Sequence, residues 1–200
     1  MFKLILASGS PRRASLLQQI NLGFDIIRPD IDESVQSGES PVDYVARMSE
    51  GKLASALEMT GPVPQTLVLC ADTIVELDGE ILLKPESEAH ATDMLMRMSG
   101  RTHLVWTSVS LGDAQRRRRE TFLVDTQVTF REITSDECRA YWATGEPADK
   151  SGSYGIQGIG AIFVASIQGS SSNVAGLPLM ETARWLREFG IDCLAMASGN

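Results

Sequence analysis

Several features are scarce in this sequence of 200 residues, and each scarcity narrows the kind of protein that it can encode. Cysteine occurs three times, an odd number at wide spacings, so neither a disulfide framework nor a zinc motif is predicted. No apolar run approaches the ~20 residues that a membrane span needs. The apolar run near the N-terminus is too short for a signal peptide, and arginines follow it at once. We therefore expect a cytoplasmic protein with no membrane partner.

Positive charge is also in short supply, because 18 Lys and Arg residues face 26 Asp and Glu residues, for a net charge of −8. A general nucleic-acid binder is expected to carry the opposite sign. The run Arg116–Arg119 is an exception, but between two expected strands it is typical of a solvated hairpin tip. We therefore predict no nucleic-acid partner. An anionic substrate would need positive residues gathered at one place.

The hydrophobic pattern is that of a globular protein with both helices and strands. Helix-start signals occur at Ser10-Pro11, at Ser40-Pro41 and at the capping box of Thr134 and Glu137, and Asp78-Gly79 indicates a hairpin. Strands are expected at Leu4–Ala7, Phe24–Ile27, Thr66–Leu77, Thr102–Leu111, Glu120–Phe130 and Ala161–Ile167. Further helices are expected around Ala91–Met98 and over Leu179–Phe189. The irregular alternation predicts an α/β fold with a mixed sheet.

The segment Ser8–Arg13 combines a strand end, a turn of small residues and a helix start. Free backbone N–H groups and the helix dipole favour an anion at such a place. Arg12 and Arg13 add fork-shaped donors that match phosphate oxygens, although arginine in a first helical turn opposes the dipole. The segment is either a phosphate-binding site or a capped helix whose arginines face solvent.

Asp72 interrupts a long apolar strand, where a carboxylate is costly to bury unless it is paired or binds a metal. It is therefore a candidate general base or metal ligand, unless it turns into solvent at a strand end. Glu33, in the acidic loop Pro29–Glu39, is a second candidate ligand for Mg²⁺, which prefers oxygen ligands. Acids in a loop are, however, more often simply solvated.

Three lysines and a glycine-rich segment complete the candidates. Lys52, Lys84 and Lys150 are weak candidates singly, but with the arginines they could neutralise a triphosphate. The glycines of 152–158 would let the backbone approach a ligand, and Gln157 could form hydrogen bonds with the edge of a base. The alternative is that this segment is an ordinary flexible connection.

Four motifs in this order resemble those of the Maf family: LILASGSPRRASLL, CADTIV followed by KP, GEPADKSGSYGIQG, and NVAGLPL. The resemblance extends from Leu4 to about Phe189. It implies a single Maf-like domain over residues 1–190, with 191–200 as a C-terminal tail. The implied fold is a mixed, twisted sheet with helices, in two lobes around a central cleft, and the implied assembly is a homodimer.

The resemblance also implies an activity, the hydrolysis of nucleoside triphosphates between the α and β phosphates, with a divalent cation (Mg²⁺ or Mn²⁺) held by Glu33 and Asp72. It assigns the catalytic base to Asp72 and substrate contacts to Ser8, Arg13, Lys52 and Lys84. Three further positions, Arg12, Thr73 and Gln157, resemble the branch that acts on dTTP and UTP.

Two alternatives stay open. The same residues would serve a pyrophosphatase for modified nucleotides. The other alternative is a nucleotide-sensing regulator of cell division that binds without turnover. Against it, the extra carboxylate of Asp72 would not help to bind a triphosphate unless a metal is present.

Overall fold

The structure is a computed structural model that describes residues 3–115 and 117–197, with side chains as far as residue 195, so Arg116 of the arginine run lies outside the described residues. The strands are β1 (Lys3–Ala7), β2 (Asp25–Ile27), β3 (Thr66–Leu77), β4 (Glu80–Leu82), β5 (Thr102–Asp113), β6 (Arg119–Phe130) and β7 (Val164–Gln168). The helices are α1 (Pro11–Gln19), α2 (Pro41–Thr60), α3 (Glu88–Met98), α4 (Ser135–Trp142), α5 (Ser171–Val174), α6 (Leu179–Glu188) and α7 (Cys193–Ala197). Short 3-10 helices are η1 (Glu146–Asp149), η2 (Ser151–Ser153) and η3 (Ile159–Phe163).

The strands of the described chain form one seven-stranded sheet in the order β2-β1-β3-β5-β6-β7, with β4 paired to β3. Strand β1 runs parallel to both β2 and β3. The pairs β3–β4 and β6–β7 are antiparallel, and the first of them is the hairpin that Asp78-Gly79 predicts. The α/β fold with a mixed sheet is thereby confirmed.

The chain divides into two compact units, in agreement with the two lobes that the family resemblance implies. Unit 1 comprises Met1–Asp72, Thr107–Val124 and Gly176–Asn200. Unit 2 comprises Thr73–Trp106 and Asp125–Ala175. The long strands β3, β5 and β6 therefore contribute residues to both units.

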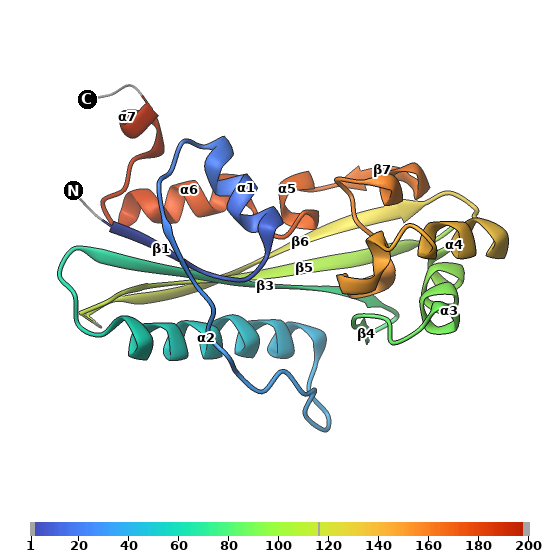
Figure 1. Cartoon of the computed structure of the whole chain (residues 1–200), viewed down its shortest axis with the longest axis horizontal. Coiled ribbons are helices and arrows are strands. Elements are labelled where there is room, and N and C mark those ends of the chain that lie inside the picture. The colour runs from blue at the N-terminus through green and yellow to red at the C-terminus, as the bar shows by residue number, and fades with distance from the viewer. Residues whose placement is uncertain (1–2, 116, 198–200) are drawn as a thin grey trace. The chain divides into compact units, whose positions relative to one another are not determined.

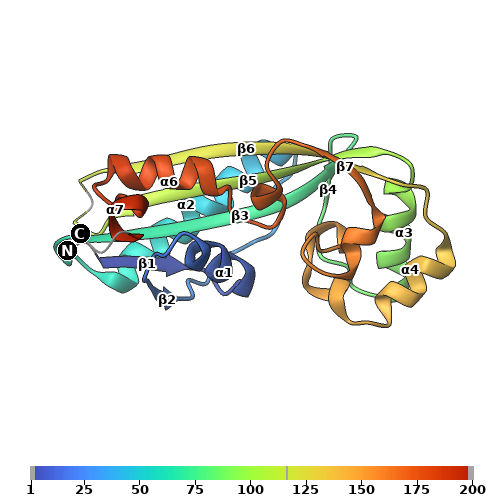
Figure 2. The same ribbon diagram turned by 90° about the horizontal axis from the view of Figure 1, so that it is seen from above.

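In unit 1, helices α1 and α6 cover one face of the sheet and α2 covers the other (Figures 1 and 2). Leu53, Ala56 and Leu57 of α2 pack in one buried cluster with Val68 of β3 and Ile5 of β1. Because this apolar stripe has helical spacing, the packing fixes which face of α2 is turned toward the sheet. The same packing also determines where the α2 side chains outside the apolar stripe lie.

The described residues of the arginine run lie at the β5–β6 hairpin tip and are exposed or half-exposed, as expected, but Arg118 also has a structural role. Arg118 Nη1 donates to the carbonyl of Glu188 at 3.0 Å, at the end of α6. Its guanidinium carbon also lies 4.5 Å from the centre of the Phe189 ring. A cation at a helix C-terminus interacts favourably with the helix dipole. Arg118 therefore holds the end of α6 within unit 1, whereas Arg117 and Arg119 are exposed.

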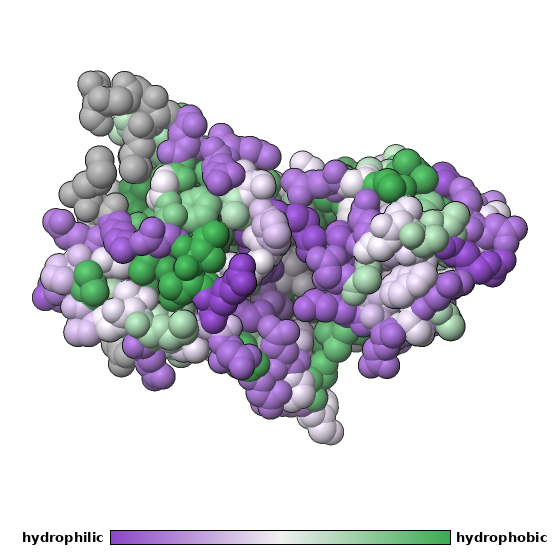
Figure 3. All heavy atoms as spheres, in the orientation of Figure 1, coloured by the Kyte–Doolittle hydropathy of each residue, from purple (hydrophilic) through white to green (hydrophobic). Residues whose placement is uncertain are grey.

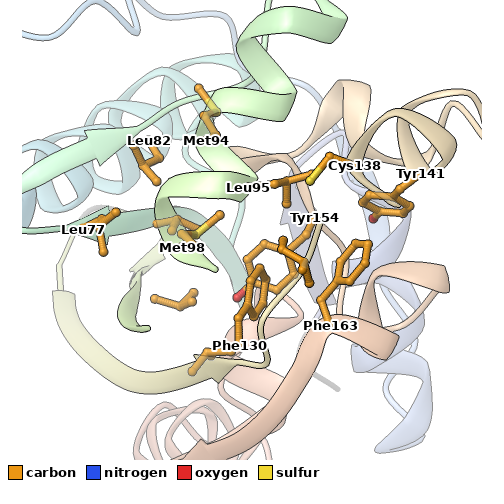
Figure 4. Close-up of a cluster of buried hydrophobic side chains, with 14 residues drawn as sticks. Leu77, Leu82, Met94, Leu95, Met98, Phe130, Cys138, Tyr141, Tyr154 and Phe163 are labelled. Carbon is orange, nitrogen blue, oxygen red and sulfur yellow. The ribbon is translucent and has the colours of Figure 1, made fainter. Parts of the chain in front are cut away.

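Unit 2 has its own aromatic and aliphatic core (Figure 4). Met94, Leu95 and Met98 of α3 lie in the same buried cluster as Phe130 and Tyr154. The Phe130 and Tyr154 rings meet edge to face, with centroids 4.8 Å apart. Such a core gives the loops of unit 2 a rigid base.

Some of the local signals in the sequence correspond to the observed element ends and others do not. The capping box of Thr134 and Glu137 and the Ser40 cap are present, but the Ser10 side chain makes no cap bond to α1. Residues 161–163 belong to η3, so the expected strand Ala161–Ile167 begins late, at Val164. The segment expected to be a tail contains helix α7.

The surface in Figure 3 is mostly hydrophilic, with hydrophobic areas separated from one another. Among the described residues, no helix is both long and apolar enough to cross a membrane.

We expect His103 to make the protein less stable in mild acid. It is 2% exposed, its Nε2 lies 2.8 Å from the Tyr154 hydroxyl, and burial lowers its pKa from 6.5 to about 4. Because the unfolded chain takes up this proton at higher pH, stability is retained above pH 6.5 and about 3 kcal/mol is lost as the pH falls to 4.

Urea unfolding across this pH range measures the loss. The decline should shrink in His103→Gln and persist in His90→Gln. A His103→Gln profile as steep as that of the wild type would show that other groups cause the decline.

Candidate functional site

Ser8 follows β1 directly and is almost fully buried in the turn that leads into α1. Its Oγ accepts hydrogen bonds from the Ser10 N–H at 3.2 Å and from Arg13 Nη1 at 3.1 Å. The strand end, the turn and the first turn of α1 are thus joined through one hydroxyl. Ser8 and Arg13, which the sequence analysis assigns to one phosphate site, are therefore in direct contact, while their role in binding phosphate stays a prediction.

Arg13 is held from a second direction, because its Nε donates to the Gly176 carbonyl at 2.9 Å. Burial lowers the pKa of Arg13, and the charge of Arg12 adds to this, while Asp72 and Glu33 oppose it. Arg13 is therefore a fixed cation inside unit 1 rather than a solvated side chain. This arrangement is suited to binding an anion that approaches the turn.

Lys52 joins the two candidate metal ligands. Its Nζ lies 2.6 Å from Asp72 Oδ1 and 2.7 Å from Glu33 Oε1. The side chains of Lys52 and Asp72 are only 14% and 16% exposed, whereas that of Glu33 is 49% exposed. Asp72 does not turn into solvent at a strand end, because it lies within β3 and is paired with the ammonium group.

The acidic loop that carries Glu33 is fastened to α2. The Tyr44 hydroxyl donates to the Glu33 carbonyl at 2.9 Å. Arg47 donates to both carboxylate oxygens of Glu39 and, at 2.8 Å, to the Ser34 carbonyl. We call this set of contacts the α2 clamp. It determines where Glu33 lies, although most of the loop side chains are exposed.

The α2 clamp has electrostatic consequences of its own. The hydrogen bonds from Arg47 lower the pKa of Glu39 to about 2, so this carboxylate stays ionised. Burial, together with the charges of Asp72 and Glu33, raises the pKa of Tyr44 to about 12, so its hydroxyl remains a donor. Tyr44, Arg47 and Glu39 were not identified from the sequence. The one available signal was a tyrosine in an apolar helix stripe.

A buried set of hydroxyls fixes α2 close to Lys52. Ser49, one turn earlier, lies with its Oγ 2.6 Å from Ser108 Oγ and 2.9 Å from Ser110 Oγ, both on β5. Ser110 in turn lies 2.9 Å from the Thr121 hydroxyl of β6. Because buried hydroxyls are costly unless paired, these contacts restrict how α2 can slide on the sheet.

The other predicted substrate residues belong to unit 2 or have few described contacts. Thr73 follows Asp72 in β3 and is half-buried, whereas Lys84 and Gln157 are exposed on loops. Arg12, in unit 1, is half-buried and acts on the pKa of Arg13. The substrate-binding roles of these four residues stay predictions.

Glu33 and Asp72 are the residues that could hold a divalent cation. Their carboxylates already converge on one positive atom, Lys52 Nζ, and both supply the oxygen ligands that Mg²⁺ prefers. Among residues 3–115 and 117–195, no group of three or more His, Cys, Asp or Glu side chains is placed to hold a metal. Two carboxylates suffice for Mg²⁺, which usually keeps several waters or substrate oxygens.

Comparisons with known proteins agree on one family. The family model described as Maf-like protein matches residues 3–189. A protein named dTTP/UTP pyrophosphatase from Vibrio vulnificus (strain YJ016) is 44% identical, over 94% of this chain and 100% of its own length. One of the same name from Methylococcus capsulatus is 47% identical, over 98% of this chain and 96% of its own length.

A solved structure from Mycobacterium abscessus, titled nucleoside-triphosphatase / dITP/XTP pyrophosphatase, is a much weaker match. It covers 99% of this chain and 97% of its own, at 14% identity and a TM-score of 0.42. A likeness of this degree supports no statement about function.

We expect Lys52→Met to destabilise unit 1 by about 1–3 kcal/mol, because a mostly buried carboxylate loses its charged partner. Adding Asp72→Asn should recover part of this loss, since the unpaired negative charge is then removed. Urea unfolding at pH 7 measures both variants. A Lys52→Met protein as stable as the wild type would mean that this ion pair contributes nothing to the fold.

Proposed function

The chain belongs to the family of Maf-like proteins, and from that premise we propose that it hydrolyses nucleoside triphosphates, preferentially dTTP and UTP, to the monophosphate and pyrophosphate. The observation that carries the proposal is the convergence of Glu33 and Asp72 on Lys52 in the unit that also holds Arg13. The names of relatives that are 44% and 47% identical over nearly the whole chain support the choice of substrate.

The electrostatics of unit 1 fit this reaction better than they fit simple binding of an anion. The carboxylates of Glu33 and Asp72 lie close to the positive side chains, and they would repel a triphosphate unless a further positive charge accompanied it. A divalent cation held by Glu33 and Asp72 would supply that charge and neutralise phosphate oxygens when bound. The proposed cofactor is therefore Mg²⁺ or Mn²⁺.

Asp72 is the proposed general base. Its carboxylate accepts a proton from a water molecule whose oxygen forms a bond to the α-phosphorus. The bond from the α-phosphorus to the oxygen that bridges to the β-phosphate breaks, and pyrophosphate leaves. Because Asp72 lies within β3, its backbone is fixed by the sheet and little of its freedom remains to be lost in this step.

The cations of unit 1 are proposed to bind the phosphates. Arg13 is oriented by Ser8 and by the Gly176 carbonyl, so its guanidinium carries its positive charge at a fixed position. Lys52 is proposed to turn from the carboxylates toward a phosphate oxygen when a cation binds. Stabilisation of charge that develops on the leaving group is the main catalytic term in phosphoryl transfer.

The finer assignments follow the family resemblance. Arg12, Thr73 and Gln157 are proposed to select the base, and Lys84 to contact the phosphates. A homodimer in the cytoplasm is proposed as the working form. The three cysteines are free, which suits a reducing compartment.

We expect Asp72→Asn to lower kcat by a factor of at least ~10², because the amide cannot accept the proton from water. Pyrophosphate release from dTTP, UTP and a panel of modified nucleotides, with Mg²⁺ or Mn²⁺, measures the effect. Asp78→Asn is the matched control, since Asp78 is exposed and paired only with Arg101 in the described contacts.

Three other results would change the proposal. Near-full activity in folded Asp72→Asn would remove Asp72 as the base. Release from modified nucleotides alone would keep the reaction and overturn the preference for dTTP and UTP. Tight nucleotide binding without any pyrophosphate release would assign the chain to the sensor class.

We expect Arg13→Gln to raise KM for dTTP by roughly 10- to 100-fold, the usual cost of a lost charge-assisted hydrogen bond. Steady-state kinetics at fixed Mg²⁺ concentration measure this, and Arg101→Gln serves as a control on an exposed arginine of unit 2. An unchanged KM in Arg13→Gln would show that Arg13 only holds the turn after β1.

A further inference from the structure

The carboxylate of Glu146 is surrounded by donors from the glycine-rich segment that carries Gln157. Its Oε1 accepts from the Gly160 N–H at 3.1 Å and from the Tyr141 hydroxyl at 2.7 Å. Its Oε2 accepts from the Ile159 N–H at 2.8 Å. One side chain therefore fixes two consecutive backbone amides just after Gln157.

Tyr141 extends this contact to the other side of Gln157. Its hydroxyl accepts from the Gly155 N–H at 3.1 Å while it donates to Glu146. Burial raises the pKa of Tyr141, so the phenol keeps its proton and can serve both partners. Glu146 and Tyr141 together hold residues 155 and 159–160, which flank Gln157 in the chain. We call this set the loop anchor.

The charge of Glu146 is also stabilised. Burial alone would raise its pKa, but the hydrogen bonds from Gly160, Tyr141 and Ile159 and the charge of Lys150 together lower it. Lys150 Nζ donates to the Glu146 carbonyl and to Asp149 Oδ1. Lys150 thus has partners within unit 2, and the carboxylate of Glu146 is ionised at neutral pH.

The spacing of glycines in this segment follows from the loop anchor. A Cβ at Gly158 would lie 2.3 Å from Glu146 Oε2, and one at Gly160 would lie 2.6 Å from the Tyr141 hydroxyl. Neither distance is possible without moving the side chain that makes the hydrogen bonds. The segment is therefore neither an ordinary flexible connection nor glycine-rich only for the sake of a ligand.

We propose that Glu146, through the loop anchor, is a positioning residue for base selection, because it fixes the backbone on which the exposed Gln157 stands. This inference rests on the proposed function, in which Gln157 reads the base. An amide that reads a base edge needs its donor and acceptor held in one orientation. Glu146 supplies that constraint while its own carboxylate is occupied by the loop.

The test is a ratio of specificities. The quantity is kcat/KM for UTP divided by kcat/KM for CTP, two substrates that share their sugar and phosphates and differ only in the donors and acceptors of the base edge. We expect this ratio to fall about tenfold in Glu146→Ala, the size of one lost oriented hydrogen bond. A purely structural role would lower the amount of active enzyme and leave the ratio unchanged.

A double-mutant cycle with Gln157→Ala tests whether Glu146 acts through Gln157. If it does, Glu146→Ala changes the ratio in the wild-type background and has little further effect once Gln157 is alanine. Equal effects in both backgrounds would overturn the inference, and so would an unchanged ratio in Glu146→Ala. An unchanged ratio in Gln157→Ala would overturn it as well, since no base reading would be left to position.

Two further variants keep the test decisive. Tyr141→Phe removes only the bridging hydroxyl and is expected to lower the ratio in the same direction, which provides a reading if Glu146→Ala does not fold. Glu137→Ala is the matched control, because Glu137 also accepts from a backbone N–H in unit 2 but contacts Arg131 and Thr134 rather than the loop. A wild-type chain that releases no pyrophosphate would refute the proposed function itself, which distinguishes that failure from these.

Discussion

The carboxylates of Asp72 and Glu33, from distant parts of the chain, both contact the ammonium group of Lys52. The main contacts of unit 1 hold these three side chains in place. Asp72 is carried by an apolar strand, so its charge would be costly without a partner so close. Glu33 reaches the same atom from a loop that the α2 clamp fastens in place. The apolar stripe of α2 and the hydroxyl of Ser49 set the helix, and the helix sets Lys52. The same residues therefore stabilise the fold and compose the candidate site.

Much of this could be predicted from the sequence because the signals were local or chemical. Short apolar runs predict the strands, and Ser40 with Pro41 predicts the start of α2. Asp72 was conspicuous because a carboxylate in a buried strand calls for a partner. That the partner is Lys52 could not be derived, since no pattern says which lysine reaches across 20 residues. A role for Glu33 beside Asp72 at a metal is predicted from the acidic loop and again by the family resemblance, whereas its contact with Lys52 is predicted by neither.

What the sequence could not predict depends on contacts between distant side chains. Arg118 looked like part of a solvated run, and only the end of α6 beside it reveals its role. The density of glycines at 152–158 predicts an approaching ligand, yet at Gly158, and at Gly160 just beyond, the group that approaches is a side chain of the protein. Glu146 precedes that segment and carries no signal of its own. The start of β7 was misjudged because the apolar residues of η3 are equally suited to a strand.

The contacts that orient the acidic loop and those that orient Arg13 differ greatly in the number of residues between the two partners. The α2 clamp joins residues 8, 11 and 13 positions apart, so it can form as soon as α2 does. The bond from Arg13 to the Gly176 carbonyl spans 163 positions. On the ribosome, the acidic loop can therefore adopt its final geometry early, whereas Arg13 waits for nearly the whole chain. A nascent or prematurely ended chain would therefore have the acidic loop in place without a properly oriented Arg13.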